Sequence, residues 1–242
     1  MKILKLGGGG EMKTILFNTE MVRAILDCIK TATRKCIKHK ISVYEENGKT
    51  YVNDNRYMLD FNLNAYIDSH AKYKKGDILY VKETWCKVVT DVDKIYFEDE
   101  WDMWDGMYLY KTDGYDLSEI GRWHPSIHMP QGAARLFLRI TRVELRKLQD
   151  IRYHEVYREG IKSVDVCNSK CHSTLPCAIK QADGERYVID AFKEFWNKTI
   201  KQSELDQFGW DANPWVWVYE FEVISKDEAM KEENNASNCV RK

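Results

Sequence analysis

The sequence predicts an α+β domain, in which a curled or barrel-like mixed sheet carries packed helices. Segments whose apolar residues have the period of strands outnumber segments with the period of helices. The two kinds of segment do not alternate regularly along the chain, and no internal repeat is visible. With 242 residues, 44% hydrophobic and 31% charged, the chain can bury one such core together with sizeable insertions.

The first third of the chain begins with a strand and a helix. The apolar run 14–17 predicts a buried strand. Asn18 or Thr19 can then cap a helix that continues to about Ile29, because apolar residues recur on one helical face. Between Lys35 and Tyr73 the sequence has no steady period, so we expect short strands and loops there.

Three later segments carry the alternation that is typical of strands. They are 74–85, where Gly76-Asp77 supplies a turn before the strand, 133–151 and 214–224. Two helices are predicted between the last two strands. One covers 152–161 and stops at Gly160, and the other is an amphipathic helix over 184–200.

The ends and insertions complete the predicted domain organisation. We expect a linker or tag-like segment at 1–11, one domain over 12–225 with insertions near 86–120 and 163–185, and a disordered charged tail at 226–242. Seven cysteines spread along the chain favour the reducing cytoplasm over a disulfide framework. No segment is long and apolar enough to predict a membrane span or a signal peptide.

The net charge of -1 does not indicate a general nucleic-acid binder. The segment 30–40 is nevertheless basic and contains no acid, whereas 97–105 is acidic. A basic patch on a neutral protein can bind phosphate locally, through few contacts. No membrane and no obligate protein partner is in evidence.

Four pieces of the sequence together resemble one family. They are "MVRAILDCIKTATRK", "KKGDILYVKETW", "RWHPSIHMPQGAARLFLRITRVELRKLQDI" followed by "HEVYREGI", and "NPWVWVYEFEVI". In this order they resemble the ASCH domain family of the PUA-like superfamily, especially the ASCH proteins of phages and prophages. The resemblance spans roughly 12–224, and the third piece is its most specific part.

The resemblance implies a fold and a chemistry. PUA-like folds are small mixed β-barrels with flanking helices, and they are associated with recognition of RNA or modified bases. The resemblance therefore implies a nucleoside, a nucleotide or RNA as the partner. The family includes a small bacterial amidohydrolase that removes the acyl group from acetylcytidine. Its lysine, nucleophilic threonine and acid correspond to Lys30, Thr33 and Glu159 here. The chain departs from many relatives at Cys28-Ile29, where they carry Gly-Arg, and at Gln131, where they carry Arg.

The residues themselves allow the same chemistry and a simpler alternative. Lys30 and Thr33 are three residues apart, so on a continuing helical turn they would lie on one side. A desolvated lysine near other cations can take the proton of a threonine hydroxyl, and a buried Glu159 can give one to a leaving amine. Alternatively, the cations only stabilise a helix C-terminus, by about 0.3–1 kcal/mol.

Other side chains are candidates to bind the substrate or the nucleic acid. On the sequence they are Thr31, Arg34, Lys35, Glu83, Trp85, Trp123, Ser126, His128 and Arg135. Either tryptophan can stack on a base, and Ser126 and His128 would share a face if they lay on a strand. The alternatives are a rigid loop whose Trp and Met fill the core, and a solvated glutamate at a strand end.

A cysteine-containing insertion gives a weaker signal. Its candidate zinc ligands are Cys167, Cys171, His172 and Cys177. The spacing lacks the paired C-x2-C knuckles of typical zinc sites, so free thiols and no cofactor are expected. Three functions stay open at this point, namely an amidohydrolase on an acylated cytidine, a non-catalytic reader of RNA or modified bases, and a phage accessory protein that acts through protein contacts.

Overall fold

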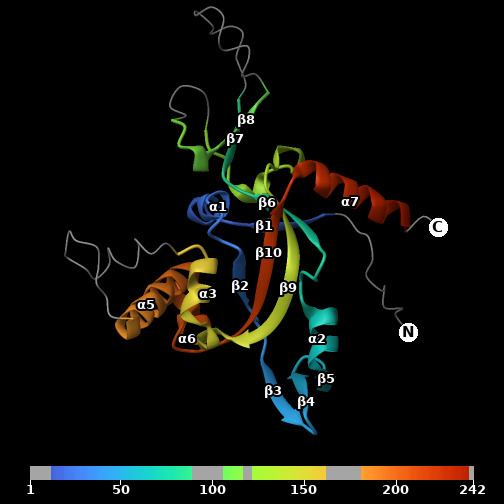
Figure 1. Cartoon of the computed structure of the whole chain (residues 1–242), viewed down its shortest axis with the longest axis vertical. Coiled ribbons are helices and arrows are strands. Elements are labelled where there is room, and N and C mark those ends of the chain that lie inside the picture. The colour runs from blue at the N-terminus through green and yellow to red at the C-terminus, as the bar shows by residue number, and fades with distance from the viewer. Residues whose placement is uncertain (1–11, 89–105, 117–121, 162–180, 240–242) are drawn as a thin grey trace, which may run out of the picture. The chain divides into compact units, whose positions relative to one another are not determined.

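The computed structural model describes residues 12–88, 106–116, 122–161 and 181–239, with the backbone alone at 181–186 and 234–239. The fold is mixed α+β (Figure 1). Its largest sheet has five strands in the order β1-β6-β9-β10-β2. The strands are β1 (Lys13–Leu16), β6 (Ile78–Lys82), β9 (Phe137–Lys147), β10 (Trp215–Ile224) and β2 (Ala32–Cys36).

This sheet is mixed because β1 pairs with β6 in parallel, whereas β6 with β9 and β10 with β2 are antiparallel. A second sheet has the order β3-β4-β5, and β7 pairs with β8. These strands are β3 (Ile41–Glu46), β4 (Lys49–Asp54), β5 (Leu59–Asn62), β7 (Trp85–Lys87) and β8 (Tyr108–Tyr110). Within the described residues, the five-stranded sheet is open, with β1 and β2 at its edges, and no closed barrel forms.

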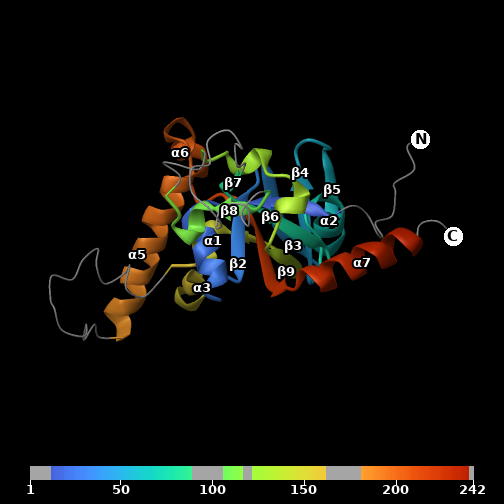
Figure 2. The same cartoon turned by 90° about the horizontal axis from the view of Figure 1, so that it is seen from above.

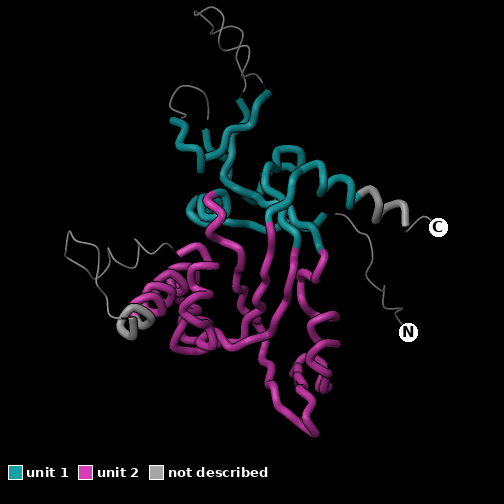
Figure 3. Tube along the Cα trace, in the orientation of Figure 1, with its two compact units in different colours: residues 1–26, 77–139, 223–242 teal, residues 27–76, 140–222 magenta. Residues whose placement is uncertain are grey.

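The chain divides into two compact units (Figure 3). Unit 1 comprises 1–26, 77–139 and 223–242, and unit 2 comprises 27–76 and 140–222. Unit 1 holds helices α1 (Thr19–Leu26) and α7 (Lys226–Cys239), and unit 2 holds α2 (Leu63–His70), α3 (Tyr153–Arg158), α5 (Gln181–Thr199) and α6 (Leu205–Phe208).

The core of unit 2 forms between α3, α5 and strand β10. Val156 of α3 and Phe192 of α5 are fully buried, together with Val216 of β10. Helix α5 lies beside α3, as Figures 1 and 2 show, and the Trp196 indole N–H donates to the carbonyl of Phe208 at the end of α6. This core fixes α3 next to the sheet, and α3 carries the acidic residues of the candidate site.

Unit 1 has a core of its own. Tyr80, Met129 and Phe137 are buried in it, and Ala229 of α7 packs into the same cluster. Glu228 and Glu232 of α7 pair with Arg139. The tail predicted to be disordered is therefore helical over Lys226–Cys239, because Ala229 and the ion pairs with Arg139 anchor one face of a segment that is otherwise polar.

Most elements lie where the sequence predicts them, with two further differences. Helix α1 is capped by Asn18, whose Oδ1 accepts from the Met21 amide, but it ends at Leu26 and not near Ile29. Cys28 adopts a left-handed conformation with φ of 59°, which ends helical geometry before Lys30. Helix α2 is not predicted, since only Tyr66 of its eight residues is buried and the apolar period is weak.

Candidate functional site

The segment "KTATRK" lies at the start of an edge strand. Ala32–Cys36 forms β2, and Thr33 pairs with Tyr219 of β10 in antiparallel register. The helical turn predicted to join Lys30 and Thr33 is therefore wrong. The left-handed Cys28 turns the chain out of α1, and the β-branched threonines suit the strand that follows.

Helix α3 supplies two carboxylates to the same place. Glu155 lies on the helix and Glu159 is its C-cap residue, so the two are one turn apart and share a face. Gly160 follows with φ of 97°, the left-handed conformation in which glycine ends a helix. The sequence "EVYREGI" thus ends α3 with both carboxylates turned toward β2.

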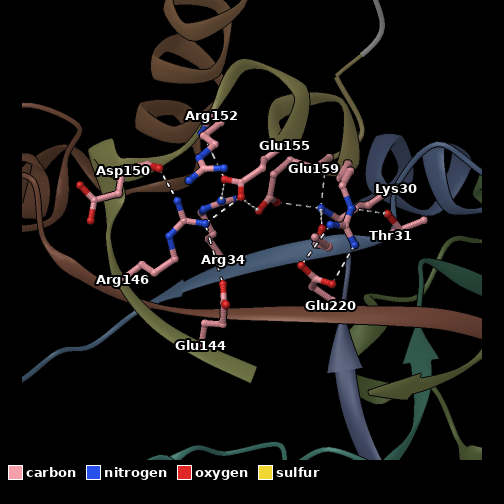
Figure 4. Close-up of polar contacts among 12 residues, drawn as sticks. Lys30, Thr31, Arg34, Glu144, Arg146, Asp150, Arg152, Glu155, Glu159 and Glu220 are labelled. Atoms are coloured by element: carbon pink, nitrogen blue, oxygen red, sulfur yellow. Dashed lines mark hydrogen bonds and ion pairs between the residues drawn. The ribbon is translucent and has the colours of Figure 1, made fainter. Parts of the chain in front are cut away.

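Lys30 and Glu159 meet inside unit 2, although they are 129 residues apart (Figure 4). Lys30 Nζ lies 3.1 Å from Glu159 Oε2, and the two side chains are 0% and 3% exposed. The same amine donates to the carbonyls of Ala32 and Glu159, at 2.8 Å each. Three acceptors match the three N–H groups of an ammonium, so the resting lysine is charged.

Arg34 ties this pair to a second carboxylate. Its Nη1 donates to Glu159 Oε1 at 2.7 Å, and its Nη2 donates to Glu155 Oε2 at 2.9 Å. Arg146 donates to the other oxygen of Glu155 at 2.7 Å. A continuous chain of ion pairs therefore runs from Lys30 through Arg34 to Arg146.

The surroundings change the proton affinities of this network. Burial lowers the pKa of Lys30, Glu159 opposes that change, and the charge of Arg34 adds to it. Burial acts to raise the pKa of Glu155, but hydrogen bonds from Arg146 and the Arg152 amide outweigh it, so this pKa lies below its usual range. A lysine that is easier to deprotonate than usual is a group that can exchange a proton.

Arg158, the residue before Glu159, links the network to Thr31. Its Nε donates to the Thr31 hydroxyl at 3.2 Å, and its two terminal nitrogens contact the two oxygens of Glu220 at 3.0 Å each. The Arg158 side chain is 40% exposed, whereas Arg34 is 2% exposed. Thr31 and Arg158 therefore form the more accessible side of the cluster.

Thr33 and Lys35 occupy other positions on the strand. Thr33 is 3% exposed and lies opposite Tyr219, whose ring contacts that of Tyr73 at 5.0 Å between centroids. Lys35 pairs with Trp217 in the same register and is exposed. Side chains alternate along a strand, so Thr33 points to the opposite face from Ala32 and Arg34.

The basic segment 30–40 has fewer uncompensated positive charges for a phosphate than the sequence suggests. Lys30 and Arg34 are balanced by the glutamates of α3, and Lys38 contacts Glu204 at 3.3 Å. A phosphate would have to compete with these carboxylates for each cation. The cluster therefore suits a neutral ligand better than a polyanion.

A second predicted group of residues falls in unit 1. Glu83 is 1% exposed, and Arg135 donates to both of its oxygens, at 2.9 and 3.1 Å. The Thr112 hydroxyl adds a third bond at 3.0 Å, and Arg135 also contacts Asp113. Glu83 is thus not solvated, and it could accept a hydrogen bond from a ligand only if Arg135 were displaced.

The aromatic and loop candidates also lie in unit 1. Trp85 packs against the unit 1 core and faces His124 at 5.1 Å, and Trp123 packs on the small cluster around Cys86. Ser126 and His128 lie in a 3-10 turn and not on a strand, so they do not share a face. These contacts correspond to the alternative in which the loop fills the core.

The remaining predictions concern metals and membranes. Cys167, Cys171, His172 and Cys177 lie outside the described residues. In the described part of the chain, no group of three or more metal-ligating side chains comes together. None of the described helices is long and apolar enough to cross a bilayer.

Sequence reasoning missed three neighbours of the Lys30–Glu159 pair, namely Glu155, Arg158 and Glu220. Glu155 could have been found, because its i, i+4 spacing from Glu159 on a predicted helix places the two acids on one face. Arg158 and Glu220 carry no such signal, since their contact depends on the register of β10 against β2.

Comparisons with known proteins bring no match. No family model, no curated protein and no solved structure matches this chain.

Proposed function

We propose that this protein binds a nucleoside beside the Lys30–Glu159 pair and hydrolyses an amide on it, as the resemblance to ASCH amidohydrolases implies. The observation that carries the proposal is the buried contact of 3.1 Å between Lys30 Nζ and Glu159 Oε2. Removing two charges from solvent costs free energy, so a buried ion pair calls for an explanation. Groups with shifted pKa values concentrate at functional sites, which favours a functional explanation here.

The pair can supply a base and an acid in one step. Transfer of one proton from Lys30 to Glu159 turns the ammonium into an amine and the carboxylate into a carboxylic acid. Burial lowers the pKa of Lys30, because it disfavours the charged ammonium in a site of low dielectric, and this favours loss of the lysine proton. The amine can then accept the proton of a nucleophile, and the acid can protonate the amine that leaves the amide.

The charge balance of the cluster supports a neutral substrate such as an acylated cytidine. Each buried cation already contacts a carboxylate, so phosphate binding would have to rely on exposed residues such as Lys35. We also propose that the fold is PUA-like. This proposal rests on the sequence motifs alone, since the open five-stranded sheet supports only the broader α+β class.

A non-catalytic reader of modified bases is the second candidate. One observation favours it, namely that Lys30 has three acceptors and so rests as an ammonium. A resting ammonium donates hydrogen bonds and is no base. In that function the cluster would hold the edge strand β2 and helix α3 in place, while other groups contact the modified nucleobase.

Incubation with N-acetylcytidine, followed by mass spectrometry, separates the two candidates. Wild-type protein should release cytidine, and Lys30→Met or Glu159→Gln should reduce the rate at least about 100-fold. Lys13→Met is the matched control, because Lys13 pairs with Asp77 at the surface of unit 1 and should leave the rate unchanged. If the protein binds the modified nucleoside without turnover, the non-catalytic reader is the function that remains. Turnover that survives both substitutions would contradict the assignment of the pair.

A further inference from the structure

The two threonines of "KTATRK" have different surroundings, and this difference bears on which hydroxyl would react. The resemblance implies Thr33 as the nucleophile. In the structure Thr33 is 3% exposed, and it lies opposite Tyr219 on β10. Thr31 is partly exposed and precedes the strand.

The register of β2 against β10 separates Thr33 from the cluster. Ala32 lies opposite Glu220 and Arg34 opposite Val218, and directly opposite residues share a face of the sheet. That face looks toward α3, because Arg34 contacts Glu159 and Glu220 contacts Arg158. Thr33 points to the other face.

Thr31, by contrast, contacts the cluster directly. Its hydroxyl oxygen accepts a hydrogen bond from Arg158 Nε at 3.2 Å, and Arg158 is held by both oxygens of Glu220. A fixed guanidinium on an oxygen stabilises negative charge there. The hydroxyl has one proton, which this contact leaves available for donation.

We propose that Thr31, and not Thr33, is the nucleophile of this site. The inference deepens the proposed amide hydrolysis and rests on it. Lys30 is the adjacent residue, and its amine donates to the carbonyl of Ala32, the residue that follows Thr31, at 2.8 Å. The base and the nucleophile are thus consecutive residues.

The reaction balances with the groups of the cluster. A proton first moves from Lys30 to Glu159. Thr31 Oγ then bonds to the acyl carbon and gives its proton to the Lys30 amine, while the C–N bond breaks and Glu159 protonates the leaving nitrogen. Lys30 and Glu159 return to their resting charges. Water cleaves the threonyl ester, which releases the carboxylic acid and restores the hydroxyl.

Two matched substitutions test the inference. Thr31→Val should lower the release of cytidine from N-acetylcytidine at least about 1,000-fold, whereas Thr33→Val should change it less than about fivefold. Thr31→Ser keeps a hydroxyl and should retain measurable turnover. Loss of activity in Thr33→Val with activity kept in Thr31→Val would overturn the inference and leave the proposed function standing.

A second measurement needs no nucleoside. Wild-type protein is treated with p-nitrophenyl acetate, and the acetyl group is located by peptide mass spectrometry. Acetylation of Thr31 that disappears in Lys30→Met supports the inference even if N-acetylcytidine is not a substrate. An acetyl group on Thr33, or on surface lysines alone, contradicts it. Absence of turnover with N-acetylcytidine in wild type contradicts the proposed substrate only.

Discussion

Unit 1 and unit 2 each bury a glutamate against a cation, and the two pairs differ in the kind of cation and in how deeply it is buried. In unit 2 Glu159 pairs with Lys30, which is 0% exposed, and with Arg34, which is 2% exposed. In unit 1 the partner of Glu83 is Arg135, which is 28% exposed. Burial acts to lower the pKa of Arg135, but hydrogen bonds to Glu83 and Asp113 outweigh it and raise this pKa, so Arg135 stays charged.

The difference bears on whether each pair can transfer a proton. An arginine stays protonated at any pH a protein tolerates, so the Glu83–Arg135 pair can only hold elements together. A lysine can lose its proton when it is buried, and the pKa of Lys30 is lowered. Of these two buried pairs, only the one in unit 2 is suited to move a proton.

The largest expected effect comes from Glu159→Gln. It leaves Lys30 buried without a countercharge and removes one of the two carboxylates on Arg34, so the free energy of unfolding should fall by about 3–5 kcal/mol. Denaturant titration measures this loss.

Glu83→Gln is the matched substitution in unit 1. Arg135 keeps its contacts with Asp113 at 2.8 and 2.9 Å and stays partly solvated, so the loss should be about 1–3 kcal/mol. A loss as large as that of Glu159→Gln would show that the two pairs are energetically alike.

Lys30→Arg tests whether the buried site of unit 2 accepts an arginine, the kind of cation that pairs with Glu83 in unit 1. The larger guanidinium must enter a fully buried space, which should cost about 1–3 kcal/mol of stability. Because an arginine does not deprotonate, release of cytidine from N-acetylcytidine should be abolished as well. A folded Lys30→Arg protein with full turnover would show that no proton leaves this position.

Arg139→Gln should have a smaller effect. Arg139 contacts Glu228 and Glu232 of α7, but these carboxylates are 46% and 43% exposed. Exposed ion pairs contribute about 0–1 kcal/mol, so the stability of unit 1 should change little. A large loss would mean that α7 depends on these pairs more than on the burial of Ala229. Circular dichroism of the variant during denaturant titration follows both helix content and stability.

The pH dependence of stability tests a third polar cluster, in unit 2. Desolvation lowers the pKa of His39 from 6.5, with help from Arg56 and against the attraction of Asp54. The folded protein therefore binds a proton less readily than the unfolded chain. The stability from this group is complete above about pH 6.5 and is lost as the pH falls through the lower folded-state pKa. Thermal melts at several pH values should show a flatter profile in His39→Gln than in wild type. Equal profiles would exclude His39 as the cause.

Regular elements were predictable from periodicity, and the contacts between them were not. β6, β9 and β10 lie within their predicted segments, because strands that are half or fully buried leave clear patterns. The convergence of Lys30 with Glu159 was expected from motif resemblance alone. The strand geometry around Thr33 was missed, since a left-handed residue such as Cys28 gives no signal in one sequence.

The register of strands explains the other omissions. Glu220 reaches Arg158 because it lies opposite Ala32, and a shift of one residue would turn Glu220 to the other face. Local patterns do not fix that pairing. Similarly, Glu83 and Arg135 were each predicted as ligand contacts, whereas the structure shows that they bind each other.

Direct titration of Lys30 tests most plainly whether its pair with Glu159 can exchange a proton. Lysine labelled with ¹³C at Cε can be followed by NMR from neutral to alkaline pH, with Lys30→Arg to assign the resonance. We expect Lys30 to titrate below the ordinary lysine pKa of 10.5, because burial disfavours its charged form. Titration at or above 10.5 would contradict a proton-transferring site and would make the pair in unit 2 structural, like that in unit 1.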